Sequence, residues 1–197
     1  MRNKNYAINI CLIPERELFW VCKTLNSLDT ESEYNTNSRI FIPHATLVMK
    51  YVWEEELREI IEQIQKLKIQ KIDTKIEAYY AKYVQADDCW TGIYLEKNPE
   101  IIALQDSICS ITKKFENRER TRDFYAIDDF FEENQIPLWD EEDFQSKDEI
   151  HITLGKTDIS KKTDTSLLPK KTVFEKIVVG HMWNYGSVRE ILFEKDL

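Results

Sequence analysis

Apolar residues along the chain follow two different periods, and together these periods predict a mixed fold. Apolar, β-branched runs predict seven strands, over residues 6–13, 41–53, 75–84, 89–96, 149–156, 172–183 and 187–194. Apolar residues at helical spacing predict three helices, over residues 15–28, 54–67 and 99–115. Polar turns at residues 85–88 and 184–186 are expected to join adjacent strands into hairpins. The pattern favours a single α+β domain, residues 1–197, made of two similar halves.

One short motif occurs twice, once in each half of the chain. Residues 43–47 read PHATL and residues 150–154 read IHITL, so two predicted strands carry His-x-Thr-Leu. Because residues i and i+2 of a strand share a face, His44 is expected beside Thr46 and His151 beside Thr153. Each strand would therefore present an imidazole and a hydroxyl together on one face.

A histidine in a strand is more often a packed or surface residue than a catalytic one, so the motif has to be weighed against chance. Two of the three histidines have Thr at +2 and an apolar residue at +3, at equivalent places in the two halves. An accident of this kind is on the order of one in a hundred. The third histidine, His181, has Trp183 at +2 and is interpreted as structural.

Two imidazoles and two hydroxyls suit the cleavage of a phosphodiester bond without a metal or other cofactor. One proton must leave the attacking oxygen and another must reach the leaving oxygen, and histidine, with an ordinary pKa of about 6.5, can do either near neutral pH. Threonine hydroxyls can donate to the non-bridging oxygens, where charge develops. His44 and His151 are therefore the candidate catalytic residues, and Thr46 and Thr153 the candidate phosphate-binding residues. Which histidine is the acid stays open.

The motif pair resembles the signature of the 2H phosphoesterase superfamily, named for two His-x-Thr/Ser motifs. Its members include RNA 2′,3′-cyclic phosphodiesterases, the so-called 2′-5′ RNA ligases, and viral enzymes that destroy 2′-5′ oligoadenylate or cyclic oligonucleotide signals. The resemblance implies two pseudo-symmetric lobes, each a small, mostly antiparallel sheet with outer helices, facing each other across an active-site cleft. It also implies the same roles for the four motif residues.

The net charge of −9 is carried by one part of the chain. Residues 115–149 contain 13 acidic and 4 basic residues, which leaves the rest of the chain neutral. A neutral body with one acidic region argues against binding of long duplex nucleic acid, which requires many Lys and Arg contacts to phosphate. It does not argue against a short nucleotide held in a pocket.

The same region predicts an acidic, aromatic insertion at about residues 116–148, which matches no usual element of the superfamily. Six aromatic residues lie among its acids, namely Phe124, Tyr125, Phe130, Phe131, Trp139 and Phe144. Disordered segments rarely carry so many aromatics. One interpretation is a lid or side structure whose aromatics dock on the body, and the other is a partner-binding surface. The first is favoured, because the aromatics would otherwise be exposed.

Four further residues are weaker candidates for substrate binding. Lys50 is expected on the strand face of His44, within reach of a phosphate, although a solvated lysine at the end of a strand is the more common situation. Trp90 and Tyr94 share a face of one predicted strand and could stack on a base, or pack in the core. Tyr185 lies in the last hairpin turn and could line the mouth of the cleft.

The composition is that of a cytoplasmic protein. No apolar run is long enough to span a bilayer, and the N-terminus lacks the long apolar region and cleavage site of a secretion signal. The four cysteines form no Cys-x-x-Cys pair, so we expect reduced thiols and no structural zinc site.

These observations predict a monomeric, metal-independent phosphodiesterase of a small cyclic nucleotide or a short 2′-5′ or 2′,3′-cyclic oligonucleotide, with no membrane partner. Water or a neighbouring ribose hydroxyl could be the attacking group. A narrower alternative is a viral or bacterial hydrolase of defence-signal oligonucleotides. A rival is a non-catalytic module that binds nucleotides or RNA ends, which two intact proton-transfer motifs disfavour. A last alternative is that the motif pair arose by chance and that this is an interaction protein which binds its partners mainly through the acidic segment.

Overall fold

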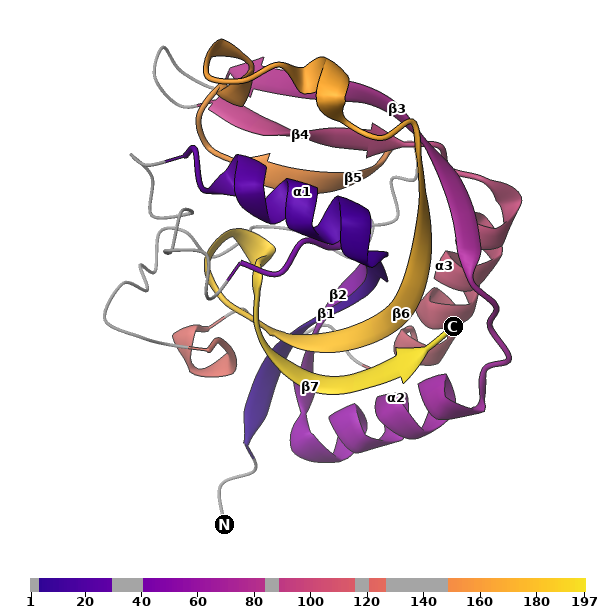
Figure 1. The fold of residues 1–197 in the computed structure, drawn as a ribbon. Coiled ribbons are helices and arrows are strands. Elements are labelled where there is room, and N and C mark those ends of the chain that lie inside the picture. Colours follow the sequence, from indigo (N-terminus) through magenta and orange to yellow (C-terminus); the bar gives the residue numbers. More distant parts are fainter. Residues whose placement is uncertain (1–3, 30–40, 84–88, 116–120, 127–148) are drawn as a thin grey trace.

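The computed structural model describes residues 4–29, 41–83, 89–115, 121–126 and 149–197, and within these residues it contains seven strands and three helices (Figure 1). The strands are β1 (Asn5–Pro14), β2 (Ala45–Trp53), β3 (Ile72–Tyr83), β4 (Cys89–Leu95), β5 (Ile150–Gly155), β6 (Lys171–Met182) and β7 (Val188–Asp196). The helices are α1 (Arg16–Asn26), α2 (Glu54–Lys66) and α3 (Pro99–Thr112). Every predicted strand and helix is present, and the α+β class is confirmed.

The strands form one antiparallel sheet whose order differs from the order of the sequence. The order is β1-β2-β5-β4-β3-β6-β7, and β1 also pairs with β6, so the first six strands close into a ring. Strand β5 lies between β2 and β4. The two strands that carry the His-x-Thr-Leu motifs are therefore neighbours, although about half of the chain's length separates β2 from β5.

Each helix buries one apolar face, as its sequence period requires. In α2 the buried side chains are Leu57, Ile60 and Ile64, and burying a side chain of this size stabilises the fold by about 1.5–3 kcal/mol. At the start of α3 the Asn98 side chain accepts a hydrogen bond of 2.9 Å from the backbone N–H of Ile101, which satisfies one of the unpaired donors of the first turn. A local sequence signal thus defines where α3 begins.

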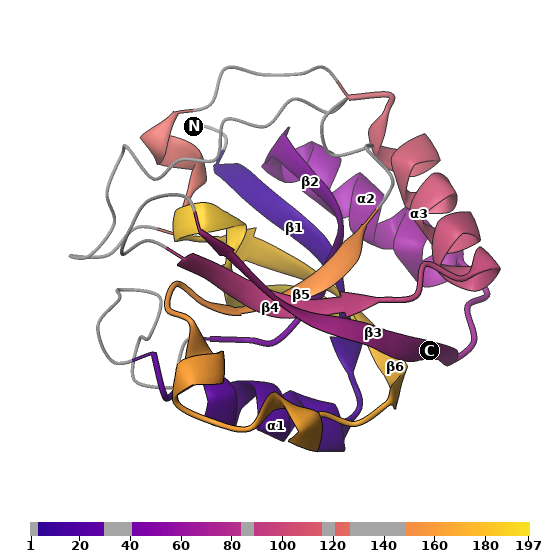
Figure 2. The same cartoon turned by 90° about the horizontal axis from the view of Figure 1, so that it is seen from above.

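The helices lie on two sides of the molecule. Helices α2 and α3 lie next to each other beside β1 and β2, and α1 lies on the opposite side, against β5 (Figure 2). None of the helices in the described ranges has the length and apolar character needed to cross a membrane.

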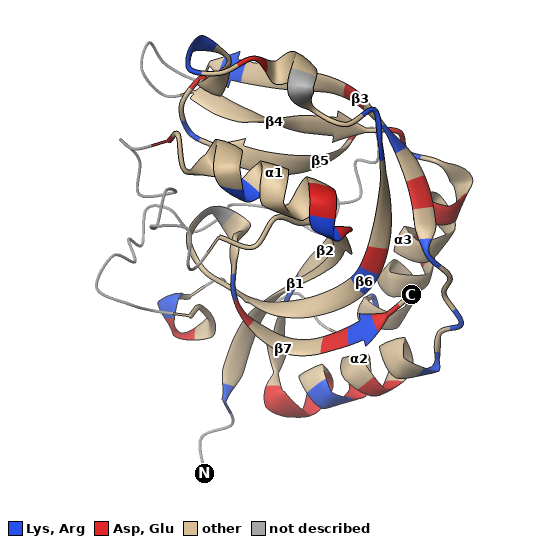
Figure 3. Cartoon of the chain, in the orientation of Figure 1, with Lys and Arg blue, Asp and Glu red and all other residues tan. Residues whose placement is uncertain are grey.

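Charged side chains are concentrated on the outer elements. Figure 3 shows them along α2 and towards the ends of β3, β6 and β7, while β1, β4 and β5 contain no Asp, Glu, Lys or Arg. Formal charges near the motif strand β5 therefore come from residues outside it, such as Glu149 immediately before it.

A short part of the predicted acidic insertion packs on the body of the protein. It includes the 3-10 helix η1 (Arg122–Phe124). Phe124 and Tyr125 are both buried, in a small second core with Tyr51 and Trp53 of β2. The hydroxyls of Tyr51 and Tyr125 lie 2.5 Å apart. These two aromatics dock as the lid interpretation expects; Phe130, Phe131, Trp139 and Phe144 lie outside the described residues.

The third histidine has a structural partner in this second core. His181 is 6% exposed, and its Nε2 lies 2.8 Å from the Phe124 carbonyl oxygen, to which it can donate. Its ring also meets the Tyr6 ring edge to face, with centroids 5.2 Å apart. His181 thus fixes the backbone of η1 onto β6.

Candidate active site

The two motifs meet where β2 and β5 pair. The bridge between these strands joins Ala45 to Ile152, and both of these side chains are fully buried. Alternation along a strand turns the flanking residues to the other face. The two motif histidines and the two motif threonines, which are all half-buried, therefore gather on that face.

The register of this bridge relates the four motif residues to one another across the two strands. Continuing it places His44 opposite Thr153 and Thr46 opposite His151. The histidines then occupy one diagonal, and diagonal positions across an antiparallel pair lie about 7–8 Å apart. An electrostatic interaction with His151 also lowers the pKa of His44. Imidazoles that extend from positions at such a spacing can both reach one phosphate group.

His44 lies immediately before β2 and is held as a neutral imidazole. Its Nδ1 lies 2.7 Å from the carbonyl oxygen of Ile42, which can only accept, so Nδ1 carries the proton. Burial lowers the pKa of His44 to about 4, and the bond to Ile42 offsets only part of this effect. The unprotonated Nε2 is then available as an acceptor.

Asn9 of β1 organises this half of the site, and the sequence analysis did not find it. Its Nδ2 donates to Thr46 Oγ1 and to the Gly186 carbonyl oxygen, each at 2.9 Å, and lies 3.2 Å from His44 Nε2. Gly186 ends the 3-10 helix η5 (Asn184–Gly186) with a φ of 75°, a conformation that favours glycine. A fully buried asparagine in the apolar run YAINICLI was the available signal.

The second motif lies against two tyrosines from β3 and β4. Tyr80 stacks on Tyr94 with ring centroids 4.4 Å apart and meets the His151 ring edge to face at 5.9 Å. Burial raises the pKa of the Tyr80 phenol, and a hydrogen bond from the Thr153 hydroxyl offsets part of this effect. Tyr94 meets His151 edge to face at 6.4 Å. Tyr80 is therefore a site residue that the sequence alone did not reveal.

Gly92 makes room for Tyr80. It lies between Tyr80 and Thr153 in the cross-strand register. A Cβ atom at this position would lie 2.5 Å from the Tyr80 hydroxyl oxygen and 2.4 Å from the Ile152 carbonyl oxygen. Only glycine lets the phenol pass over the strand and reach Thr153.

His151 lies in a field of opposing charges. Burial lowers its pKa, the nearby Glu149 carboxylate raises it, and the Lys82 ammonium lowers it again. The Tyr94 hydroxyl also donates a hydrogen bond to the Glu149 carboxylate. The Glu149 carboxylate therefore favours the protonated form of His151. The His44 pKa, by contrast, is set by burial, by the Ile42 carbonyl and by His151.

The end of α1 fixes the backbone of β5 directly after the second motif. Asn26 Nδ2 donates to the Leu154 carbonyl oxygen at 2.7 Å, and the Lys156 N–H donates to Asp29 Oδ2 at 2.7 Å. Between them, a Cβ on Gly155 would lie 2.6 Å from the Asp29 carboxylate. These contacts hold the strand of His151 from the side opposite the site.

The expectation for Lys50 was wrong, because β2 contains a β-bulge. Ile10 pairs with Val48 but the next residue, Cys11, pairs with Thr46, so β2 carries one extra residue there. An extra residue reverses the alternation of side chains beyond it. Lys50 pairs with Ile8 of the main core and is 2% exposed. It lies on the face opposite Thr46, and hydrophobic periodicity gave no sign of the bulge.

The other weak candidates have different surroundings. Trp90 and Tyr94 share a face, as predicted, because they pair with Lys82 and Ala78 of β3. Trp90 is half-buried, packs in part on the main core, and has the Lys156 ammonium 5.5 Å from its ring centroid. Tyr185 belongs to η5, and its side chain lies outside what the structure describes. Substrate binding by these residues stays a prediction.

The site contains two imidazole rings, two threonine hydroxyls and two stacked tyrosine rings beside His151. Within the described ranges, no group of three or more His, Cys, Asp or Glu side chains is arranged to hold a metal ion. The described groups can accept a proton, donate a proton and donate hydrogen bonds to an oxyanion.

Solved structures share this architecture over nearly the whole chain. The structure of E. coli LigT complexed with 3′-AMP matches at a TM-score of 0.55 and 10% identity, covering 98% of both chains. A structure described as a phosphoesterase matches at 0.55 and 12%, with the same coverage. TT0787 of Thermus thermophilus matches at 0.52 and 15%, covering 97% of both chains. No family model and no curated protein sequence matches the chain.

The chain therefore has the α+β fold of these solved structures. More particularly, it has a LigT-like fold, with seven antiparallel strands and three helices in the described part of the chain. The resemblance inferred from the two motifs is confirmed at the level of the fold. At these identities the likeness concerns the fold alone.

Proposed function

We propose that the protein is a phosphodiesterase that acts by paired-histidine acid–base catalysis and needs no metal. The observation that carries the proposal is the bridge between β2 and β5, whose register sets His44 and His151 on one diagonal with a threonine beside each. Two imidazoles supply both proton transfers, and two hydroxyls supply donors to the phosphoryl oxygens.

The surroundings of the two histidines support different roles for them. His44, with its pKa lowered to about 4 by burial and with Nδ1 bonded to a carbonyl, favours the neutral ring and acts as the base. His151 has Glu149 to favour its protonated ring and acts as the acid. In the hydrolysis of a cyclic phosphate, His44 takes a proton from water and His151 gives one to the leaving ribose oxygen.

We also propose a two-lobe arrangement for the ring of strands. One lobe would comprise β1, β2, β6 and β7, the other would comprise β3, β4 and β5, and the cleft would follow the narrow bridge between β2 and β5. A single bridge joins β2 to β5, whereas β1 pairs with β2, and β4 with β5, along most of their lengths. This contrast supports a boundary at that point.

The substrate class is a small cyclic nucleotide or a short oligonucleotide with a 2′-5′ bond or a 2′,3′-cyclic end. The similar E. coli LigT has been solved with 3′-AMP, with ATP and with phosphate. The stacked pair Tyr80 and Tyr94 beside His151 provides aromatic surface next to the proposed phosphate position. A flat base is the chemical group that such a surface suits.

The test is turnover of a panel of substrates in the presence of EDTA. The panel contains the four 2′,3′-cyclic nucleoside monophosphates and oligoadenylates with 2′-5′ or 3′-5′ bonds. We expect product from at least one, and loss of that activity in H44A and H151A. Inhibition by the chelator that added metal reverses would contradict the proposed mechanism, and binding of the panel without turnover would favour a non-catalytic module.

A further inference from the structure

We propose that Lys82 and Lys156 form a second phosphate subsite, which binds the phosphate next to the reacting one along a nucleotide chain. Trp90 lies on β4, the strand between the two lysines. The inference rests on the proposed function and deepens it, because such a subsite selects substrates with a further phosphate over a simple cyclic nucleotide.

The cross-strand register places Lys82 and Trp90 on the sheet face of the second motif. Gly92 pairs with Thr153, and Trp90 is two residues further along β4, so it shares their face. Lys82 pairs directly with Trp90 and therefore lies on this face too. Two residues of a strand span about 6.6 Å. Successive phosphates of a nucleotide chain are separated by one ribose, which spans a comparable length.

A β-bulge turns Lys156 to the same face. Between two consecutive residues of β4, the partner on β5 advances from Thr153 to Gly155, so β5 carries one extra residue. This reverses the alternation of side chains beyond it. Gly155 accordingly faces Asp29, near the end of α1. Lys156 faces the other way, and its Nζ lies 5.5 Å from the centroid of the Trp90 ring.

The charges around the second motif favour a polyanion that runs towards the lysines. Glu149 lies two residues before His151, whereas Lys156 directly follows the end of β5. Glu149 raises the His151 pKa and Lys82 lowers it, so the fields of both charges reach the catalytic ring. A second phosphate is therefore repelled towards Glu149 and attracted towards the lysines.

Trp90 is the positioning residue of this subsite. A lysine ammonium within about 6 Å of an aromatic centroid is attracted to the ring, and Lys156 meets this condition. The indole is half-buried and packs in part on the main core, which fixes it, whereas Lys82 is exposed. An ammonium that is ordered before the substrate arrives loses less side-chain freedom on binding.

The sharpest test compares two substrates that differ by one phosphate, namely the shortest active substrate of the panel with and without a 5′-phosphate. We expect kcat/KM of the wild type to be about tenfold higher with it. K82Q and K156Q should each lower this ratio by about two- to fivefold, the range of exposed ion pairs. Because the ratio compares substrates on one variant, it cancels the effect of Lys82 on the His151 pKa.

The role of Trp90 is tested by a double-mutant cycle. W90L should lower the ratio as K156Q does, and it should lower it little further in a K156Q background, because Trp90 acts through Lys156. Additive losses would overturn this role. If W90L does not fold, K82Q and K156Q decide whether the subsite exists.

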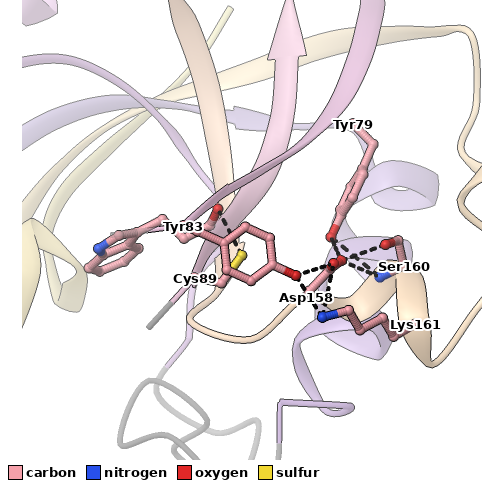
Figure 4. A network of polar contacts seen from close by, with 7 residues as sticks. Tyr79, Tyr83, Cys89, Asp158, Ser160 and Lys161 are labelled. Carbon is pink, nitrogen blue, oxygen red and sulfur yellow. Dashed lines mark hydrogen bonds and ion pairs between the residues drawn. The ribbon is translucent and has the colours of Figure 1, made fainter. Parts of the chain in front are cut away.

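Lys161 provides a matched control for the loss of one positive charge. Its Nζ lies 5.1 Å from the centroid of the Tyr83 ring, but Tyr83 follows Lys82 and so faces the other side of β3. There it belongs to a network with Tyr79, Asp158 and Ser160 (Figure 4). K161Q should leave the ratio unchanged. A decrease as large as that in K156Q would mean that overall charge sets the preference, and would overturn the inference.

A third substrate identifies the source of the second phosphate. It carries one further nucleotide at the 5′ end, so that the phosphate is a diester. A preference for it that K156Q lowers assigns the subsite to an oligonucleotide, and a preference confined to the 5′-phosphate assigns it to a terminal phosphate. Either result supports the subsite. Added salt should reduce the preference, and less so in K82Q and K156Q.

The failure of this inference is distinguishable from the failure of the proposed function. Equal kcat/KM with and without the 5′-phosphate, in an active enzyme, would overturn the inference and leave the function standing. If the wild type turns over nothing, NMR titration with adenosine 3′,5′-bisphosphate and with 3′-AMP decides. Tighter binding of the bisphosphate that K156Q removes would leave the inference standing without the function. Equal affinities would overturn both.

Discussion

The two halves of the candidate site contain the same pair of motif residues in very different surroundings. His44 is bonded to a backbone carbonyl and faces an amide from β1, and its pKa is set by burial, by that carbonyl and by His151. His151 meets two stacked tyrosine rings edge to face, and Glu149 and Lys82 act on its pKa in opposite directions. The comparison teaches that the motif supplies the reactive groups, and that residues around each motif shift the pKa values of the two histidines by different means. Inequality is what a reaction needs when one group must take a proton and the other must give one.

The largest expected effect comes from removing either histidine. H44A and H151A should each lower kcat by about 10²–10⁴, the usual contribution of one general acid or base. Because both act on the same phosphate, the double variant should be little slower than the slower single variant. Steady-state kinetics of the three variants check this, and full activity in either single variant would contradict the paired mechanism.

Gly92 belongs to the Tyr80 half alone, so its substitution should damage that half selectively. G92A places a Cβ against both the Tyr80 hydroxyl and the Ile152 carbonyl oxygen, and overpacking of this kind typically costs about 1–3 kcal/mol. We expect a lower melting temperature together with a loss of kcat, because the displaced Tyr80 ring lies edge to face with His151. A variant with the melting temperature and kcat of the wild type would show that Tyr80 does not need this space.

The dependence of the rate on pH reports the pKa values of the two histidines directly. The base must be neutral, so the rate should fall on the acid side, with the free enzyme limited by the His44 pKa of about 4. The acid must be protonated, so the rate should fall on the alkaline side, limited by a His151 pKa that burial lowers from its ordinary value. The profile of kcat/KM should therefore be a bell with its optimum on the acid side of about 6.5.

Two substitutions should move one limb of that bell in opposite directions. Glu149 raises the His151 pKa, so E149Q should shift the alkaline limb to lower pH; Lys82 lowers it, so K82Q should shift the limb to higher pH. The acid limb, which belongs to His44, should stay in place in both. A shift of the acid limb instead would reverse the assignment of acid and base.

The smallest effect is expected at Lys50. This side chain lies on the core face of β2 and not beside Thr46, so K50M should leave kcat and KM near their wild-type values. A large rise in KM for the substrate would mean that the ammonium reaches the phosphate and that the bulge does not turn it away. Kinetics at low and high salt would detect such a charge contribution.

Local chemistry made a large part of this protein predictable from its sequence. The seven strands and three helices follow from hydrophobic period, which depends only on near neighbours along the chain. The boundaries differ most at the ends of elements: the helix expected over residues 99–115 ends at Thr112, and the strand expected from residue 41 begins at Ala45. The four motif residues could be found because a histidine and a threonine two apart define their own relative placement.

Tertiary structure alone decided which strands meet and what surrounds the motifs. The bridge of β2 to β5 depends on contacts between residues far apart in the sequence, so no local pattern contains it. The same is true of Asn9 and Tyr80, which come from β1 and β3, and of the bulge that turns Lys50 to the core. A strand's period specifies two faces but not which face a partner will cover, because register is set by packing across the whole sheet.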